Sequence, residues 1–178
     1  MDFDLLGSEE IYRGRAFKVE QVQARLPNGQ VRQFDLVRHP GAVVIIPIDN
    51  EGRIWFVRQY RVGAGQVMLE LPAGTLEPGE DPEVCAAREV REETGMAAAS
   101  LHKLGGFYMA PGYTSEYLHI FLANGLTPKP LQADADEFLQ TTALPVDNVY
   151  GMVARGEIID GKTLASLLLM QQHREPLE

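Results

Sequence analysis

Apolar and polar residues alternate in part over residues 16–26 and again over residues 31–38, a spacing typical of β-strands with one buried face. Between the two segments lies Leu26-Pro27-Asn28-Gly29, and an Asn-Gly pair favours the tight turn of a β-hairpin. We therefore expect residues 1–40 to form a small antiparallel β-sheet that precedes a main domain over residues 41–178.

The main domain begins with a strand pattern of a different kind. Residues 42–48 are almost continuously apolar, as in a buried strand, and the turn Asp49-Asn50-Glu51-Gly52 ends this run. Further strands are expected at residues 53–59, 67–71, 104–109 and 117–123. Two C-terminal helices are expected at residues 146–155 and 162–173, the second with a buried stripe formed by Leu164, Leu167, Leu168 and Met170.

Another helix is predicted in the middle of the chain by its end signals. Asp81 can cap the free N–H groups of a first turn, and proline, here Pro82, is tolerated at that position. Gly95 favours a stop, since glycine accepts the left-handed conformation that ends many helices. Apolar residues at helical spacing predict a buried stripe formed by Val84, Ala87 and Val90.

Three glutamates of this helix share one face. Glu89, Glu92 and Glu93 stand at positions i, i+3 and i+4 and so lie one turn apart. Like charges at this spacing repel by roughly 0.2–0.5 kcal/mol per pair on an exposed helix, and Arg88, four residues before Glu92, offsets only part of that repulsion. Either the glutamates form an ordinary solvated face, or a cation binds them.

The turn Leu71-Pro72-Ala73-Gly74, which precedes the helix, favours the second interpretation because it can add backbone carbonyl oxygens. Oxygen ligands suit a hard divalent ion, Mg²⁺ or alternatively Mn²⁺, which keeps coordination positions for water and substrate phosphate. The sequence thus predicts a metal site and a phosphorylated substrate.

The segment from Gly74 to Met96, called the signature segment below, fits the pattern G-x5-E-x7-R-E-U-x-E-E-x-G-U, where U is a bulky aliphatic residue. All nine positions match: Gly74, Glu80, Arg88, Glu89, Val90, Glu92, Glu93, Gly95 and Met96. In this pattern the chain resembles the Nudix hydrolases. The resemblance implies an α/β fold, a Nudix α/β/α sandwich with a mixed sheet, and metal-dependent hydrolysis of a diphosphate linked to another moiety.

The same resemblance implies roles for residues of the signature segment. Glu89 and Glu93 would be the principal metal ligands, together with the backbone carbonyl of Ala73. Glu92 would be a ligand or the general base. Two further residues would support them: Glu80 from nearby and Arg88 by orienting the glutamates.

The substrate must be specified outside the signature segment. Pro111 lies sixteen residues after Gly95, in a segment that runs from Phe107 to Glu116. A proline at this distance is typical of the ADP-ribose and nucleotide-sugar pyrophosphatases of the family, although a plain Pro-Gly turn is the alternative. Pro111 and Glu116 are therefore candidate substrate-binding residues.

Arginines are candidates for the diphosphate because a guanidinium can bind phosphate oxygens in a bidentate way. Arg61 matches the position that contacts substrate phosphates in the subfamily. Arg58 is a further candidate, for which a structural or rim charge is the favoured alternative. By the same resemblance, Arg32 and Arg38 belong to the N-terminal part that lines the nucleoside pocket of a partner subunit. The alternative is that both face solvent.

An acidic cluster, Asp134, Asp136 and Glu137, matches a loop that closes over the substrate and activates the attacking water in similar enzymes. A solvated surface loop is the alternative. Ala135 interrupts the acidic run, so the identity of the general base stays open among this cluster, Glu92 and Glu93.

Composition restricts the remaining possibilities. The net charge of −9 argues against a nucleic-acid binder, which usually has a basic face. No apolar run approaches the roughly 20 residues that cross a bilayer, and the first residues lack a basic signal-peptide start, so we expect a cytoplasmic protein without a membrane segment. Cys85 is the single cysteine and is expected to pack in the core rather than act as a nucleophile.

Together these features predict Mg²⁺-dependent hydrolysis of ADP-ribose to AMP and ribose 5-phosphate, or of a related nucleoside diphosphate sugar. GDP-mannose or another GDP-sugar is the alternative substrate, and a non-catalytic nucleotide-sugar sensor is the alternative of another class. The resemblance also implies a homodimer built partly by exchange of the N-terminal sheet.

Overall fold

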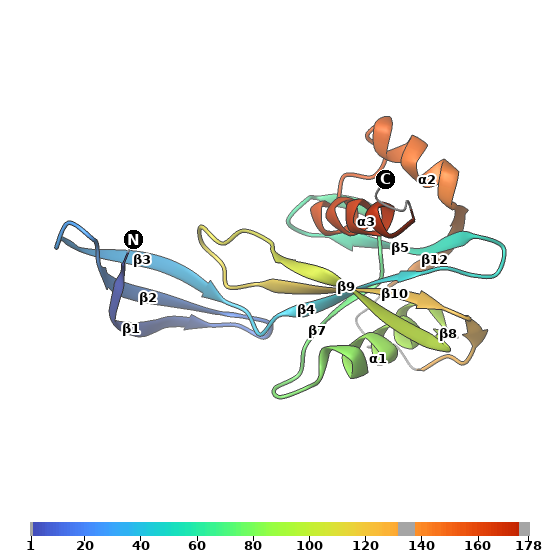
Figure 1. Cartoon of the computed structure of the whole chain (residues 1–178). Coiled ribbons are helices and arrows are strands. Elements are labelled where there is room, and N and C mark those ends of the chain that lie inside the picture. The colour runs from blue at the N-terminus through green and yellow to red at the C-terminus, as the bar shows by residue number, and fades with distance from the viewer. Residues whose placement is uncertain (1, 132–137, 175–178) are drawn as a thin grey trace.

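A computed structural model describes residues 2–131 and 138–174 of the chain, and Figure 1 shows its layers. The central sheet has the strand order β7-β4-β10-β9. Strand β10 runs parallel to β4, and the other neighbours are antiparallel, so the sheet is mixed as predicted. Its strands are β4 (Ala42–Pro47), β7 (Ala73–Thr75), β9 (Ser100–Tyr108) and β10 (Tyr117–Asn124).

Helix α1 (Pro82–Thr94) packs on one face of the central sheet. The other face carries α2 (Val146–Ala154), α3 (Gly161–Arg174) and a second sheet of order β12-β5-β6. That sheet consists of β5 (Arg53–Arg61), β6 (Gln66–Glu70) and β12 (Gln140–Pro145), while β8 (Met96–Ala97) and β11 (Thr127–Pro128) form a separate short pair. The predicted α/β/α sandwich is confirmed. No helix in the described part of the chain is long and apolar enough to cross a membrane.

Strand β4 explains why the molecule has two apolar cores. Its six residues are all buried, and successive side chains point to opposite faces of the sheet. Val44 and Ile46 pack with the second sheet, α2 and α3, whereas Val43 and Ile45 pack under α1. The continuous apolar run that predicted this strand therefore reflects burial on both sides.

Helix α1 begins and ends where its sequence signals indicated. The Asp81 side chain accepts a hydrogen bond of 2.8 Å from the Glu83 N–H, and Gly95 adopts a left-handed φ of 73°. The predicted buried stripe was wrong in part, because Val84 is 61% exposed and Ala87 is also exposed. The buried face instead consists of Cys85, Ala86, Glu89, Val90, Glu93 and Thr94. Two glutamates lie on it, which apolar spacing alone could not predict.

The C-terminal helices occur where predicted. Leu167 and Met170 of α3 are buried, but Leu168 is 59% exposed, so its assignment to the buried stripe was wrong. Leu168 follows Leu167 directly, and a rotation of about 100° per residue turns it away from the core.

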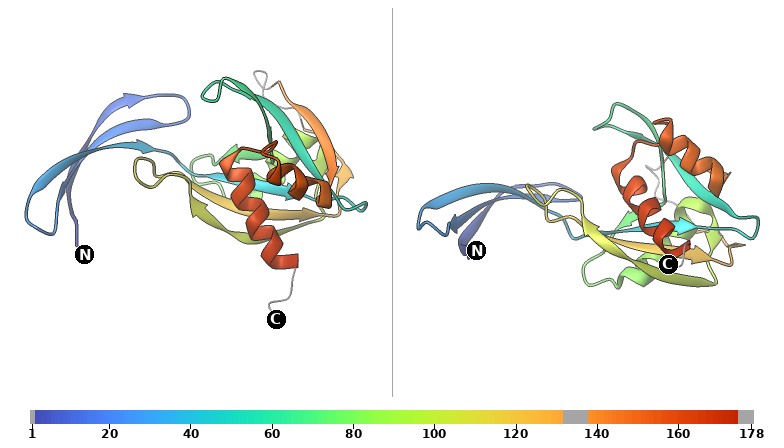
Figure 2. Two further views of the ribbon diagram at one scale, coloured as in Figure 1. Left: turned by 90° about the horizontal axis from the view of Figure 1, so that it is seen from above. Right: turned by 45° about the horizontal axis from the view of Figure 1, so that its top comes forward.

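The N-terminal strands form a separate antiparallel sheet that projects from one end of the core (Figure 2). Strands β2 (Lys18–Arg25) and β3 (Val31–Arg38) form the predicted hairpin, in which Gly29 has a φ of 83°. Strand β1 (Asp4–Arg13) was not predicted, because all ten of its residues are exposed and no buried face constrains their polarity. The division into residues 1–40 and 41–178 stays a prediction.

Charged groups at the end of β6 connect the second sheet to α3. Glu70 is 1% exposed and accepts hydrogen bonds from Arg61 Nε (2.9 Å) and Nη2 (2.7 Å), and also from Lys162 Nζ. Burial by itself would raise the pKa of Glu70, but the hydrogen bond from Arg61 and the charge of Lys162 outweigh it and lower that pKa. One residue later, the Leu71 N–H donates to Thr163 Oγ1 at 2.9 Å. The start of α3 therefore fixes the strand that leads to the signature segment.

We expect Asp81→Ala to lower the free energy of unfolding by about 1 kcal/mol, because the substitution removes the N-cap of α1. Asp81→Asn is the matched control, since asparagine caps helices about as well, and it should stay within a few tenths of a kcal/mol of the wild type. Urea unfolding measures both, and equal stability of the two variants would contradict the assigned cap.

We expect Glu70→Gln to destabilise the chain at neutral pH by about 1–3 kcal/mol, less than for a fully buried pair because Arg61 is 41% exposed. Since pairing lowers the pKa of Glu70 below its ordinary 4.5, the stabilisation is present above that value and is lost as the pH falls through the folded-state pKa.

The difference in unfolding free energy between wild type and Glu70→Gln should therefore shrink as the pH falls below the ordinary glutamate pKa of 4.5. Glu157→Gln breaks only an exposed pair with Arg155 and serves as the control, with an expected cost below about 1 kcal/mol. A difference for Glu70→Gln that is independent of pH would refute the assigned ion pair.

Candidate active site

The turn before the signature segment and helix α1 meet at two close contacts. The Ala73 N–H donates a hydrogen bond of 3.0 Å to Glu93 Oε2. At Gly74, a Cβ atom would stand 1.9 Å from the carboxyl carbon of Glu89, so any side chain there would displace that carboxylate. The first glycine of the signature segment is therefore needed for the close approach of Glu89 to the backbone of β7.

Arg88 binds three of the carboxylates. Its Nη1 donates to Glu89 Oε1 (2.6 Å) and to Glu92 Oε2 (2.9 Å), and its Nε and Nη2 donate to the two oxygens of Glu80 (3.2 and 3.1 Å). The hydrogen bond from Arg88 lowers the pKa of Glu80, and the same bond raises the pKa of Arg88 although burial opposes it. One guanidinium thus holds side chains from the turn before α1 and from two positions on the helix.

Glu89 and Glu92, together with Glu77 and Glu93, line a cleft of about 430 Å³, which we call the glutamate cleft. One wall comes from the turn between β1 and β2, which faces the tip of the β5–β6 hairpin (Figure 2, left). The lining residues are Arg15, Ala16, Gln59, Arg61, Ala73, Gly74, Thr75, Glu77, Arg88, Glu89, Glu92 and Glu93.

A second cavity of about 310 Å³ adjoins the glutamate cleft, and we call it the side compartment. Both cavities are lined by Arg61 and by residues 73–75, so Arg61 stands at their common boundary. The remaining lining residues of the side compartment are His39, Ala42, Glu116, Leu118 and Lys162.

Three carboxylates and nearby backbone oxygens are the donors that a hard divalent cation prefers, so the chemistry of the residues fits the predicted metal. Their present geometry is that of an ion-pair cluster. Among residues 2–131 and 138–174, no group of three or more His, Cys, Asp or Glu side chains converges as a preformed metal site. Glu89 and Glu92 bond to Arg88 instead, and Glu93 bonds to the Ala73 N–H. Metal binding therefore requires these carboxylates to exchange partners.

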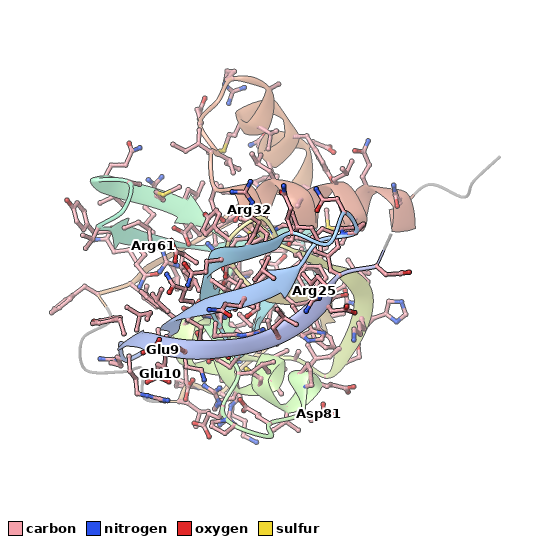
Figure 3. All side chains as sticks on the ribbon, turned by 90° about the vertical axis from the view of Figure 1, so that its left-hand side faces the viewer. Glu9, Glu10, Arg25, Arg32, Arg61 and Asp81 are labelled. Atoms are coloured by element: carbon pink, nitrogen blue, oxygen red, sulfur yellow. The ribbon has the colours of Figure 1, made fainter. Side chains whose placement is uncertain are left out.

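The other predicted substrate-binding residues lie in different surroundings. Arg38 bonds to the buried Glu20 at 2.8 Å and lines a third cavity of about 460 Å³ beside the β1–β2 turn. Arg32 is exposed on β3 of the N-terminal sheet, which faces the viewer in Figure 3. Arg58 and Pro111 are also exposed, and neither lines the glutamate cleft or the side compartment. Asp134, Asp136 and Glu137 lie outside the described residues.

Three residues of the site were missed by the sequence reading: Arg15, Glu70 and Lys162. Arg15 follows β1, a strand that gave no signal. Of the three, only Glu70 could have been noticed in the sequence. It is a lone carboxylate at the end of an apolar strand, and such a group needs a cationic partner when it is buried. Its partner Lys162 lies 92 positions further along the chain, and only the fold brings the two together.

Cys85 is confirmed as a packing residue. It is completely buried on the face of α1 that packs on the central sheet, and burial raises the pKa of its thiol to about 12, so it is not a thiolate at neutral pH.

Comparison with known proteins agrees with this geometry. The family model described as "NUDIX domain" matches residues 37–167. The "Methanol dehydrogenase activator" of Bacillus methanolicus is 40% identical over 92% of this chain and 90% of its own length. The "ADP-ribose pyrophosphatase" of Bacillus subtilis (strain 168) is 35% identical, over 93% of this chain and 91% of its own.

Two further similarities bear on the fold and on the substrate. The "GDP-mannose pyrophosphatase" of Yersinia enterocolitica is 32% identical over 76% of this chain and 75% of its own length. A crystal structure of "ADP compounds hydrolase" superimposes with a TM-score of 0.85 at 28% identity, covering 97% of this chain and 94% of that one. The family match spans most of the chain and includes the whole signature segment. The chain belongs to the NUDIX domain family.

Proposed function

We propose that this chain hydrolyses the pyrophosphate bond of ADP-ribose and forms AMP and ribose 5-phosphate. The observation that carries the proposal is the glutamate cleft, in which Glu89, Glu92 and Glu93 stand beside Arg61 in a member of the NUDIX family. The relative named ADP-ribose pyrophosphatase, which matches over almost the whole chain, supports the choice of substrate.

The proposal includes a divalent cation, Mg²⁺ or alternatively Mn²⁺. Glu89, Glu93 and Glu92, with the backbone of Ala73, would hold it. When bound, such an ion supplies positive charge to the phosphate oxygens and lowers the pKa of a coordinated water.

The residues of the chain account for the other parts of the reaction. A water oxygen attacks one phosphorus of the pyrophosphate, and the bond from that phosphorus to the bridging oxygen breaks. A carboxylate accepts the water proton, either Glu92 or Glu93 or one from the segment of Asp134, Asp136 and Glu137. The guanidinium of Arg61 binds phosphate oxygens at the boundary of the two cavities.

GDP-mannose is the second candidate substrate, because the relative named GDP-mannose pyrophosphatase also covers three quarters of the chain. The chemistry at the glutamate cleft would be the same. A non-catalytic sensor is disfavoured, since all nine residues of the signature segment are those of the pattern. A cytoplasmic location stays a prediction.

We expect the wild-type chain to release AMP from ADP-ribose in the presence of Mg²⁺ and not in the presence of a chelator. Glu93→Gln should lower kcat/KM by about 100-fold or more, because loss of a general base alone costs that much. We expect a loss of at least this size also if Glu93 is a metal ligand. Glu83→Gln is the matched control, since Glu83 is exposed in the first turn of the same helix.

The assay compares ADP-ribose, GDP-mannose, ADP-glucose, diadenosine polyphosphates and NADH by kcat/KM. A higher value for GDP-mannose than for ADP-ribose would replace the proposed substrate. Full activity of folded Glu93→Gln at saturating Mg²⁺ would reject the proposed site.

We also propose that the chain forms a homodimer through the N-terminal sheet. Strand β1 is exposed at every position and lies at the sheet edge, where its backbone groups can pair with another chain. The sheet and the β1–β2 turn also expose large apolar side chains, which are typical of a protein interface: Phe3, Leu5, Leu6, Ile11, Tyr12, Phe17, Val31 and Phe34.

Light scattering should give twice the mass of one chain for the full-length protein and the mass of a single chain for a truncated protein that begins at Arg38. The truncation removes β1, β2 and most of β3 and so removes the proposed interface. A monomeric mass for the full-length protein would exclude the homodimer.

A further inference from the structure

Two cations share the buried carboxylate of Glu70. Arg61 binds both of its oxygens, and Lys162 Nζ binds Oε2. A single carboxylate needs only one positive counter-charge, so Glu70 has one more than it needs. Lys162 also has a second negative partner, since its Nζ donates to Asp160 Oδ2 at 2.9 Å. Asp160 also caps the start of α3 by accepting from the Thr163 N–H at 3.0 Å. The position of the ammonium group is therefore fixed by two carboxylates from different parts of the chain.

The ammonium group of lysine has three donors. Glu70 and Asp160 account for two of them. The Lys162 side chain also lines the side compartment, which leaves its third donor for a ligand there. Arg61, the other cation bound to Glu70, lines the same compartment.

The charges around the two cavities differ in sign. In the described lining of the glutamate cleft, four carboxylates (Glu77, Glu89, Glu92 and Glu93) outnumber three guanidinium groups (Arg15, Arg61 and Arg88). Of the described residues that line the side compartment, Arg61 and Lys162 carry permanent positive charges and Glu116 is the one carboxylate, so cations outnumber carboxylates there. A substrate with two phosphoryl groups that extends from the cleft therefore meets cations on the compartment side.

We propose that Lys162 is a substrate-binding residue that donates its third N–H to a phosphoryl oxygen of the substrate in the side compartment. Glu70 then acts as a positioning residue, because it holds Lys162 and Arg61 at a fixed separation. This inference rests on the proposed function, since it takes the substrate to be a nucleoside diphosphate sugar.

The test compares Lys162→Gln with Lys162→Arg. Lys162→Gln removes the charge and should raise KM for ADP-ribose by about 10- to 100-fold, the range for a hydrogen bond to a charged group, with a smaller effect on kcat. Lys162→Arg keeps a cation and should restore most of the affinity. Lys103→Gln is the control, since Lys103 is an exposed lysine of β9 that lines neither cavity.

Lys162→Gln also leaves Glu70 with one cation fewer, which can destabilise the fold. The comparison of Glu70→Gln with the double variant Glu70→Gln/Lys162→Gln avoids this problem, because neither protein contains the Glu70 carboxylate that would lose a cation. The two proteins differ only in the ammonium group, and KM should still be higher in the double variant by about 10-fold or more. Thermal unfolding verifies that each variant is folded.

Binding of ADP-ribose in a chelator, measured by calorimetry, gives a readout without turnover. A higher dissociation constant for Lys162→Gln than for Lys103→Gln supports the role of Lys162 in binding. This holds even if the wild type releases no AMP, and in that case only the proposed function fails. The inference is overturned if the wild type hydrolyses ADP-ribose but two comparisons show no difference in KM. The first comparison is Lys162→Gln with Lys103→Gln, and the second is the double variant with Glu70→Gln.

Discussion

The repulsion among the glutamates of α1 is the constraint on which the rest of the site depends. Glu89 and Glu93 are both less than 10% exposed, so their charges are only weakly screened by water. Arg88 neutralises part of this charge through Glu80, Glu89 and Glu92, and the Ala73 N–H stabilises Glu93. These partners keep several carboxylates on one wall of a cleft without a buried unpaired charge.

Residues 73–75 line both cavities and so lie between the carboxylates of α1 and Lys162 of the side compartment. The carboxylates lie on the α1 side, and Arg61 lies at the boundary with the side compartment. Glu70 prevents Arg61 from being drawn to the glutamates, because it binds the guanidinium through two nitrogens and is itself almost fully buried. A buried carboxylate of this kind contributes to the site by fixing the direction of a cation as well as by stabilising the fold.

The sheet between the two cores gives this arrangement its rigidity. Strand β4 pairs with β7 on one side and with β10 on the other, and its residues are buried on both faces. Gly74 lies opposite Val43 in that pairing, so the atoms that contact Glu89 belong to a strand with little freedom to move. The start of α3 adds a further constraint through Thr163 and Leu71.

Elements and residues with local signals could be predicted from the sequence. The Asp81 cap, the Gly95 stop, the apolar run of β4 and the spacing of the nine signature residues depend only on neighbours within a few positions, and each was readable. Elements without a buried face, such as β1, and short ones such as β7 and β8 gave no pattern because too few residues carry it.

The buried face of α1 and the pairing of distant charges depend on the packing of the whole chain and could not be predicted from the sequence. Glu89 and Glu93 lie on the buried face of α1, which apolar spacing had assigned to Val84 and Ala87. They are buried there because the backbone at Gly74 and Ala73 contacts their carboxylates. Arg61, Glu70 and Lys162 come from three separate elements, and Arg15 reaches the cleft from the N-terminal sheet. Such contacts join residues that lie tens of positions apart in the sequence. They form because the whole core is buried when the chain folds, which no local pattern records.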